Sequence, residues 1–322
     1  MTAEAGICAR RQSFVTLSKS SLDHAPAVRT LAGTPRKTMR KPIAFFLILL
    51  ATLYPTPAPA SLLNLSTRVE IPAPGLGEDI TSVIGGFVID GSGRKILIRA
   101  LGPSLAAFGL VPLADPVLEL HDASGAIIAT NDNWMETQEA DILDTGLAPS
   151  DPLESAILMT LPVGSYTAII QGHKDGGPVP TSGTTLFEVY DISLTPAEGL
   201  VNVSTRGAVQ RTADPMIAGL VIANGDEDTV LVRALGPSLE EFGLGGLSDP
   251  RLDLFDAEGN LLASNENWQD TQAAEIEATG LAPSDPLEAA IVITLPRGSY
   301  TTVLSPVEGI AHGIALAELY KL

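Results

Sequence analysis

This chain of 322 residues is poor in the residues that most often carry chemistry. It has one cysteine, Cys8, four histidines and only 5 % aromatic residues. A lone thiol excludes an internal disulfide framework. The sequence contains no HExxH or CxxC motif, and no glycine-rich phosphate loop followed by Lys and Ser or Thr. It therefore indicates neither a zinc site nor nucleotide chemistry.

Positive charge is also scarce. The chain sets 19 Lys and Arg residues against 38 Asp and Glu residues, for a net charge of −19. This balance excludes nucleic acid as a partner, because nucleic-acid binding needs basic grooves that displace counterions. It also argues against anionic membrane surfaces. A strongly acidic surface keeps a protein soluble and favours divalent cations.

The main feature of the chain is an internal repeat with an offset of 134 residues. The segment RALGPSL at 99–105 returns at 233–239, and TGLAPSDPLE at 145–154 returns unchanged at 279–288. A repeat of this length predicts a duplicated domain, because each copy holds enough residues to bury a core of its own. We therefore expect each copy to fold alone.

The first sixty residues resemble a secretion signal behind a leader. Met39-Arg40-Lys41 is basic, residues 43–54 are apolar and too short for the ~20 residues of a membrane span, and Ala58-Pro59-Ala60 fits a cleavage site. We predict cleavage after Ala60, a secreted protein of the extracellular space or periplasm, and no membrane insertion afterwards. The leader predicts a mis-assigned start, with translation from Met39; a cytoplasmic tail on an uncleaved anchor is the alternative. The predicted parts are a leader at 1–38, a signal peptide at 39–60, copy one at 61–192, a linker at 193–199 and copy two at 200–322.

Short apolar runs separated by turn residues predict an all-β fold. Each copy should form a jelly-roll-like β-sandwich of eight strands with one short helix, giving two tandem domains. Asp122 to Gly125 and Asp256 to Gly259 are typical of hairpin turns. The strands of copy one are expected near 62–70, 83–90, 95–101, 117–122, 126–131, 155–161, 165–172 and 184–192.

The helix of each copy is expected to begin at Asn133 or Asn267, since asparagine is a good N-cap. Gly146 and Gly280 fit the left-handed position that ends a helix. The adjacent Trp134 and Trp268 are interpreted as core anchors rather than ligand platforms.

The order L-x-L-x-D-x-x-G, then Asn-Asp-Asn, then an apolar strand and L-P-x-G-x-Y-T runs from Leu118 to Thr167 and again from Leu252 to Thr301. It resembles the bacterial pre-peptidase C-terminal domain, a β-sandwich appended to secreted proteases. This resemblance implies a β-sandwich that accompanies an exported enzyme. The RALGPSL and TGLAPSDPLE segments are outside that pattern and are similar to a repeat of extracellular bacterial proteins of unknown function.

The catalytic candidates are weak. His121, His173 and His312 are not repeated between the copies, whereas Ser104 and Ser238 are repeated without a base beside them. A serine nucleophile needs a histidine and a carboxylate in place. We interpret the Gly-Pro-Ser segment as a rigid turn and predict that the protein is not an enzyme.

A calcium site is the one metal hypothesis that the sequence offers, although no cofactor is required. Carboxylate and amide oxygens at neighbouring loop positions suit Ca²⁺. The alternative is that these residues only form turns and cap a helix. The candidate ligands are Asp122, Asn131, Asp132 and Asn133 in copy one, and Asp256, Asn265, Glu266 and Asn267 in copy two.

Two ion pairs are predicted inside the copies: Arg99 with Glu188, and Arg233 with Glu318. Each charge interrupts an apolar strand and recurs in both copies. A buried charge needs a partner, and the planar fork of arginine can bind a carboxylate through two hydrogen bonds. The alternative is that all four point to solvent.

Three function classes remain open. The first is a secreted, non-catalytic protein with a structural, adhesive or binding role at the cell exterior, with a glycan or a protein as its extracellular ligand. The second is a carbohydrate-binding protein, which an exposed Trp or Tyr pair would favour. The third is a secreted hydrolase or its accessory domain, which a cleft joining His121 or His173 to paired carboxylates would favour.

Overall fold

The computed structural model describes residues 62–72, 81–173, 182–193, 200–209, 214–309 and 312–322. The predicted leader, signal and cleavage point after Ala60 lie outside these residues, as does most of the predicted linker. Among the described residues, no helix is long and apolar enough to cross a membrane.

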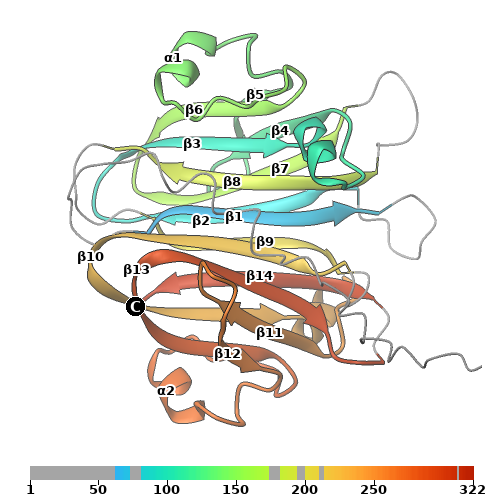
Figure 1. The fold of residues 1–322 in the computed structure, drawn as a ribbon, viewed down its shortest axis with the longest axis vertical. Coiled ribbons are helices and arrows are strands. Elements are labelled where there is room, and N and C mark those ends of the chain that lie inside the picture. The colour runs from blue at the N-terminus through green and yellow to red at the C-terminus, as the bar shows by residue number, and fades with distance from the viewer. Residues whose placement is uncertain (1–61, 73–80, 174–181, 194–199, 210–213, 310–311) are drawn as a thin grey trace, which may run out of the picture. The chain divides into compact units, whose positions relative to one another are not determined.

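The regular structure of the described residues is mostly β-strand, with a few short helices (Figure 1). The prediction of an all-β fold is therefore confirmed, and the eight strands expected in copy one are present within one residue at each end. These strands are β1 (Leu62–Ile71), β2 (Val83–Ile89), β3 (Arg94–Leu101), β4 (Pro116–His121), β5 (Ile127–Asn131), β6 (Ser155–Leu161), β7 (Gly164–Gly172) and β8 (Gly183–Asp191).

Copy two repeats this order with fewer, longer strands. Its β10 and β13 each continue through a hairpin position that interrupts the equivalent strands of copy one. The strands are β9 (Leu200–Val209), β10 (Met216–Leu235), β11 (Pro250–Phe255), β12 (Leu261–Asn265), β13 (Ala289–Pro306) and β14 (Gly313–Lys321).

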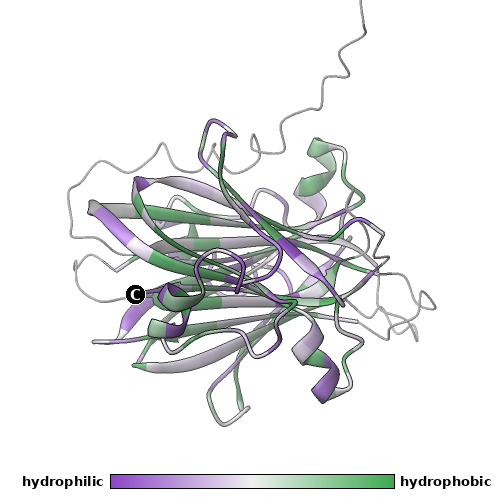
Figure 2. Cartoon of the chain, turned by 90° about the horizontal axis from the view of Figure 1, so that it is seen from below, coloured by the Kyte–Doolittle hydropathy of each residue, from purple (hydrophilic) through white to green (hydrophobic). Residues whose placement is uncertain are grey.

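Within copy one the strands pair in two groups of four. One group has the order β6-β3-β8-β1, and the other has the order β5-β4-β7-β2. Copy two has the same two groups, with the ends of β10 and β13 serving in both. Figure 2 shows apolar residues along many of the strands, with hydrophilic residues at several strand ends and on parts of the short helices.

The two copies are joined edge to edge by main-chain hydrogen bonds. Strand β1 of copy one pairs with β10 of copy two, and β2 pairs with β9. One apolar core then runs through both copies and includes Phe87 and Phe187 as well as Val203 and Leu220. The structure thus differs from the expectation that each copy buries its own core. The reason is that the copies leave four strand edges whose backbone groups need partners, and each copy supplies those of the other.

The seam between the copies is built from equivalent residues. Strands β1 and β9 lie parallel to each other. Thr205 Oγ1 donates a hydrogen bond of 2.9 Å to Thr67 Oγ1, and the two threonines hold equivalent places in the repeated segments NLSTR and NVSTR. Gly207 faces its own equivalent, Val69, so closely that an added Cβ would lie 2.2 Å from a Val69 methyl carbon. Glycine is required there by the close approach of the two strands.

A crossing segment, residues 132–154, connects β5 to β6 and covers the outer face of the β6-β3-β8-β1 group. Its Trp134, Ile142 and Leu147 pack on Leu97 and Tyr190 as a small apolar cluster. Trp134 and Trp268 are 3 % and 6 % exposed, which confirms them as core anchors. Figure 1 shows the helix α1 (Glu139–Asp144) on this segment and the helix α2 (Ala273–Ala278) on the equivalent crossing segment of copy two, residues 266–288.

The predicted start of each helix is wrong. The N-cap positions belong to Gln138 and Gln272, five residues after the asparagines. The reason is that the side chain and carbonyl of Asn133 are engaged in a turn: its Nδ2 donates to Glu136 Oε1 at 3.1 Å, and its carbonyl accepts from Glu136 N. The helix end is as expected, since Gly146 and Gly280 both have a φ of +70°.

Candidate functional site

The structure brings Arg99 and Glu188 together across strands β3 and β8. They are directly opposite in the strand register, and the Glu188 carboxylate accepts hydrogen bonds from Arg99 Nε at 2.9 Å and from Nη2. The two side chains are 5 % and 4 % exposed. Arg233 and Glu318 repeat this geometry in copy two with somewhat more exposure.

A tyrosine and a carbonyl complete each ion pair. Tyr190 donates from its hydroxyl to Glu188 at 2.8 Å, and the Arg99 guanidinium lies 5.0 Å above the Tyr190 ring. Arg99 Nη1 also donates to the Leu147 carbonyl of the crossing segment. Burial by itself lowers the pKa of Arg99, but Glu188 and Tyr190 outweigh burial, so the pKa is raised above its ordinary value. The pair therefore fastens the crossing segment to the sheet beneath it.

Glu154, the last residue of TGLAPSDPLE, is the residue that sequence reasoning missed. Its side chain is fully buried, and Oε1 accepts hydrogen bonds from Gly102 N and Ser104 N at 3.1 Å each, as well as from Ser104 Oγ. Glu288 does the same for Gly236 and Ser238. The carboxylate holds the start of a 3-10 helix, η3 (Pro103–Phe108) or η4 (Pro237–Phe242).

These contacts account for both long repeated motifs. RALGPSL supplies Arg99 and the Gly-Pro-Ser turn, and TGLAPSDPLE supplies Glu154 and the carbonyl of Leu147. The two motifs of each copy are therefore bound to each other by hydrogen bonds. The Ser104 hydroxyl donates a hydrogen bond to the Glu154 carboxylate. This contact favours the interpretation of the Gly-Pro-Ser segment as a rigid turn over that of Ser104 as a nucleophile.

Each copy has a further ion pair, and its charges are exchanged between the copies. Arg94 Nε lies 3.6 Å from Asp191 in copy one. The equivalent residues of copy two are Asp228 and Lys321, with Nζ to Oδ1 at 3.2 Å. Reversed polarity at equivalent positions indicates that the pairing itself was retained. Comparing the two copies position by position in the sequence could have predicted this ion pair.

The predicted calcium ligands do not gather at one point. Asp122 is at the tip of the β4–β5 hairpin, where its Oδ1 accepts from Ser124 N, Ser124 Oγ and Ala126 N; these hydrogen bonds lower the pKa of Asp122. Asp132 is at the other end of β5, roughly 15 Å away at ~3.3 Å per residue. One ion cannot bind both, and the same holds for Asp256 and Glu266 in copy two.

The asparagines among the predicted calcium ligands are hydrogen-bonded to backbone groups. Asn131 donates from Nδ2 to the Asn133 carbonyl at 3.0 Å and accepts from Ala156 N at 2.8 Å. Asn265 makes the same two contacts with Asn267 and Ala290, and Asn267 also donates to Asp270. These asparagines thus hold the crossing segments in place.

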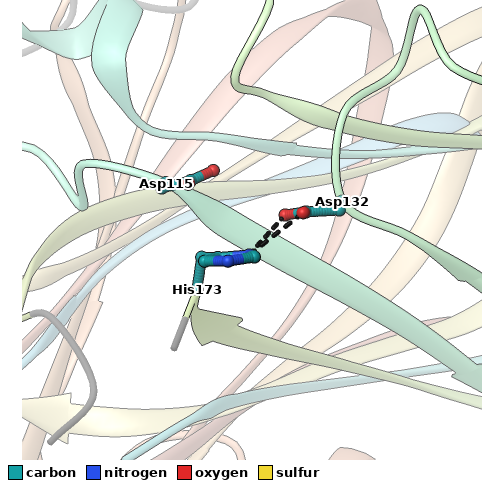
Figure 3. A group of neighbouring side chains, drawn as sticks. All are labelled: Asp115, Asp132 and His173. Atoms are coloured by element: carbon teal, nitrogen blue, oxygen red, sulfur yellow. Dashed lines mark hydrogen bonds and ion pairs between the residues drawn. The ribbon is translucent and has the colours of Figure 1, made fainter. Parts of the chain in front are cut away.

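Within the described part of the chain, one group of metal-ligating side chains does converge, and it includes one of the predicted ligands, Asp132. Asp115 precedes β4, Asp132 follows β5 and His173 follows β7, so adjacent strands bring all three to one end of the sheet (Figure 3). One ligand atom from each lies within 4.8 Å of the others. His173 Nδ1 is 3.0 Å from Asp132 Oδ2, and all three side chains are partly buried. Asp115 and His173 are far apart in sequence, which is why no motif indicated this group.

The seam also forms an open groove of about 480 Å³ on the outer surface. Its floor includes Gly86 from β2 and Ser204 and Arg206 from β9, and its wall includes Phe242 from η4. Phe242 is 74 % exposed, and its equivalent Phe108 is 56 % exposed. A Cβ at Gly86 would lie 2.7 Å from Ser204 Oγ, so a larger residue at this position would clash with the neighbouring strand.

Comparisons with known proteins give little. No family model matches the chain, and no curated protein matches it. Among solved structures, the subviral particle of infectious bursal disease virus VP2 is similar at 11 % identity over 83 % of this chain and 74 % of that chain. Its TM-score is 0.16, and a likeness of that size carries no argument about function.

Proposed function

We propose that this chain is a secreted, non-catalytic structural or adhesive protein of the cell exterior. Its two jelly-roll-like sandwiches, fused through their edges, would associate with further copies of the chain. The motifs that both copies retain hold the framework together, as the contacts of Arg99 and Glu154 illustrate. The observation that carries the proposal is that two edge strands away from the seam, one in each copy, have exposed apolar side chains.

The outer edges β5 and β12 have features of an association surface. Among the strands that the structure describes, each pairs with one neighbour only, β4 or β11. Ile127 and Ile128 on β5 are exposed, and so are Leu261 and Leu262 at the equivalent places of β12. An apolar edge strand offers unpaired backbone groups and buried area to another strand. Because the chain has one such edge at each end, contact between unlike ends would produce open linear assemblies.

The other free edges, on β6 and β13, are covered instead. The Gln138 amide donates to the Leu158 carbonyl at 2.7 Å and accepts from Leu158 N at 3.0 Å. Gln272 makes the same contacts with Val292. Side-chain amides therefore occupy the backbone groups that another strand would use. The edges of β6 and β13 are therefore blocked by side chains of the same chain, whereas those of β5 and β12 are available to another strand. This difference supports specific association through β5 and β12.

Sedimentation over a range of concentrations tests this function. We expect the full chain to form dimers and larger species, and the double variant Ile128→Lys with Leu262→Lys to remain a monomer. The matched control is Leu153→Lys with Leu287→Lys, which changes two equally exposed, equally repeated side chains outside the edge strands and should still associate. A monomeric full chain at all concentrations, or an unaffected edge variant, would refute the proposal.

A carbohydrate-binding function is the second candidate, and the groove at the seam favours it. An aromatic side chain with polar groups nearby is the arrangement in which a sugar ring stacks and forms hydrogen bonds. Phe242 offers the ring, and Arg206 and Ser204 offer donors. The described residues provide no exposed Trp or Tyr pair; Trp134, Trp268, Tyr166, Tyr190 and Tyr300 are all buried.

A glycan screen with two variants separates the candidates. If the groove binds sugars, Phe242→Ala should remove binding and Phe108→Ala should not, because Phe108 does not line the groove. Equal binding by both variants, or no binding by the unaltered chain, would exclude this candidate and leave the association test unaffected.

A further inference from the structure

The group formed by Asp115, Asp132 and His173 has the donors of a transition-metal site. It offers one imidazole nitrogen and two carboxylate groups, from three different loops that adjacent strands hold together (Figure 3). Zinc and its neighbours accept imidazole and carboxylate ligands together, whereas calcium prefers oxygen alone. The donor set therefore differs from the all-oxygen calcium site that the sequence predicted.

Copy two shows what this position holds when the histidine is absent. Its equivalent acids are Asp249 and Glu266, and Val307 replaces His173. There Arg251 Nη1 donates to Glu266 at 2.7 Å, while Nε and Nη2 of the same guanidinium bind Asp253. Copy one has Val117 in place of Arg251. A guanidinium thus balances one acid of copy two.

In copy two, Glu266 is close enough to Asp249 to affect its pKa. Burial and then the neighbouring Glu266 raise the pKa of Asp249. Two partly buried carboxylates side by side are stabilised by a cation. Copy two supplies that cation from its own chain. Copy one keeps both acids but replaces the arginine with valine and adds a ligating nitrogen.

We propose that Asp115, Asp132 and His173 bind a divalent transition-metal ion in copy one, where the equivalent acids of copy two have instead an arginine bound to one of them, Glu266. Three protein ligands leave a zinc ion at least one coordination position for water or for an external ligand. This site is independent of the edge association proposed above.

Zinc titration of the full chain is the test, carried out with Cys8→Ser throughout to remove the only thiol. We expect one zinc ion per chain to bind at this site. His173→Val, which reproduces the residue of copy two, should weaken binding at least ~10-fold, as should Asp132→Asn, because the loss of support around a metal typically costs that much or more. The matched control is His121→Phe, the other histidine that copy two lacks, and it should bind zinc as the parent does.

Melting curves in EDTA establish that each variant is folded, and the added zinc should raise the melting temperature of the parent and of His121→Phe only. If zinc does not bind, or if His173→Val binds as tightly as the parent, the proposal is wrong. Equal weakening by His121→Phe and His173→Val would mean adventitious binding to single histidines and would overturn the proposal. Binding of calcium in preference to zinc would also overturn it.

Discussion

At the scale of single residues, the chain is held together by a few buried charges that both copies retain. Arg99, Glu188 and Glu154 are at most 4 % exposed, and each has its charge satisfied by fixed partners. Such groups contribute modestly when intact and cost a great deal when one partner is removed. Their repetition is therefore explained by the penalty of losing either partner.

The Arg99–Glu188 pair gives the first prediction. Arg99→Met or Glu188→Gln should each lower the unfolding free energy by ~3 kcal/mol, because the remaining partner stays buried and unbalanced. The double variant should recover part of the loss. Urea denaturation measures all three. Arg251→Met, which breaks a more exposed pair, is the control and should cost less than ~1 kcal/mol. Equal effects in the two places would contradict the burial argument.

The tyrosine beside the second pair gives a pH dependence. Burial first, and then the Glu318 carboxylate, raise the pKa of Tyr320 from an ordinary value of 10.0 to about 12. The folded chain thus keeps this proton between those pH values while the unfolded chain loses it. The unfolding free energy should fall as pH rises from about 10 to about 12. Tyr320→Phe should show a shallower fall in denaturation at pH 9 to 12, and an identical slope would rule the linkage out.

At the scale of elements, the sequence predicted the strands well and their partners poorly. Alternating apolar residues and turn glycines define the strands, because both are local signals. The helix start was missed because the hydrogen bonds of Asn133 to Glu136 hold a turn there, which composition does not show.

Arg99 and Glu188 were predicted, although they are 89 residues apart, because each interrupts an apolar strand and recurs in both copies. Glu154 and Asp115 were missed because neither interrupts an apolar strand: Glu154 is at the end of a loop and binds a turn 50 and 52 residues earlier, and Asp115 meets His173 only because β4 pairs with β7.

The seam strands give a prediction at this scale. Gly207→Ala should destabilise the chain by ~1–3 kcal/mol, because the new methyl group meets Val69 on β1. Adding Val69→Ala should restore part of the stability, since it removes the clashing methyl groups. Thermal unfolding of the two variants decides this. A Gly207→Ala variant as stable as the parent would show that β1 and β9 do not approach so closely.

At the scale of the whole molecule, the duplication has produced one folding unit from two similar halves. The repeat indicated two copies, but it could not show that β1 pairs with β10 and β2 with β9. Each copy alone would expose these edges and part of the common core. Residues 200–322 expressed alone should therefore be unfolded or self-paired through β9 and β10, and a stable folded monomer would not be expected.

Calorimetry of a chain destabilised in copy one alone tests the shared core most directly. Glu154→Gln weakens the hydrogen bonds to Gly102 and Ser104 in copy one and leaves Glu288 in copy two intact. If the copies form one cooperative unit, the variant will unfold in a single transition at a lower temperature, with equal calorimetric and van't Hoff enthalpies. Two transitions, one of them at the original temperature, would show that the copies unfold independently and would contradict this account.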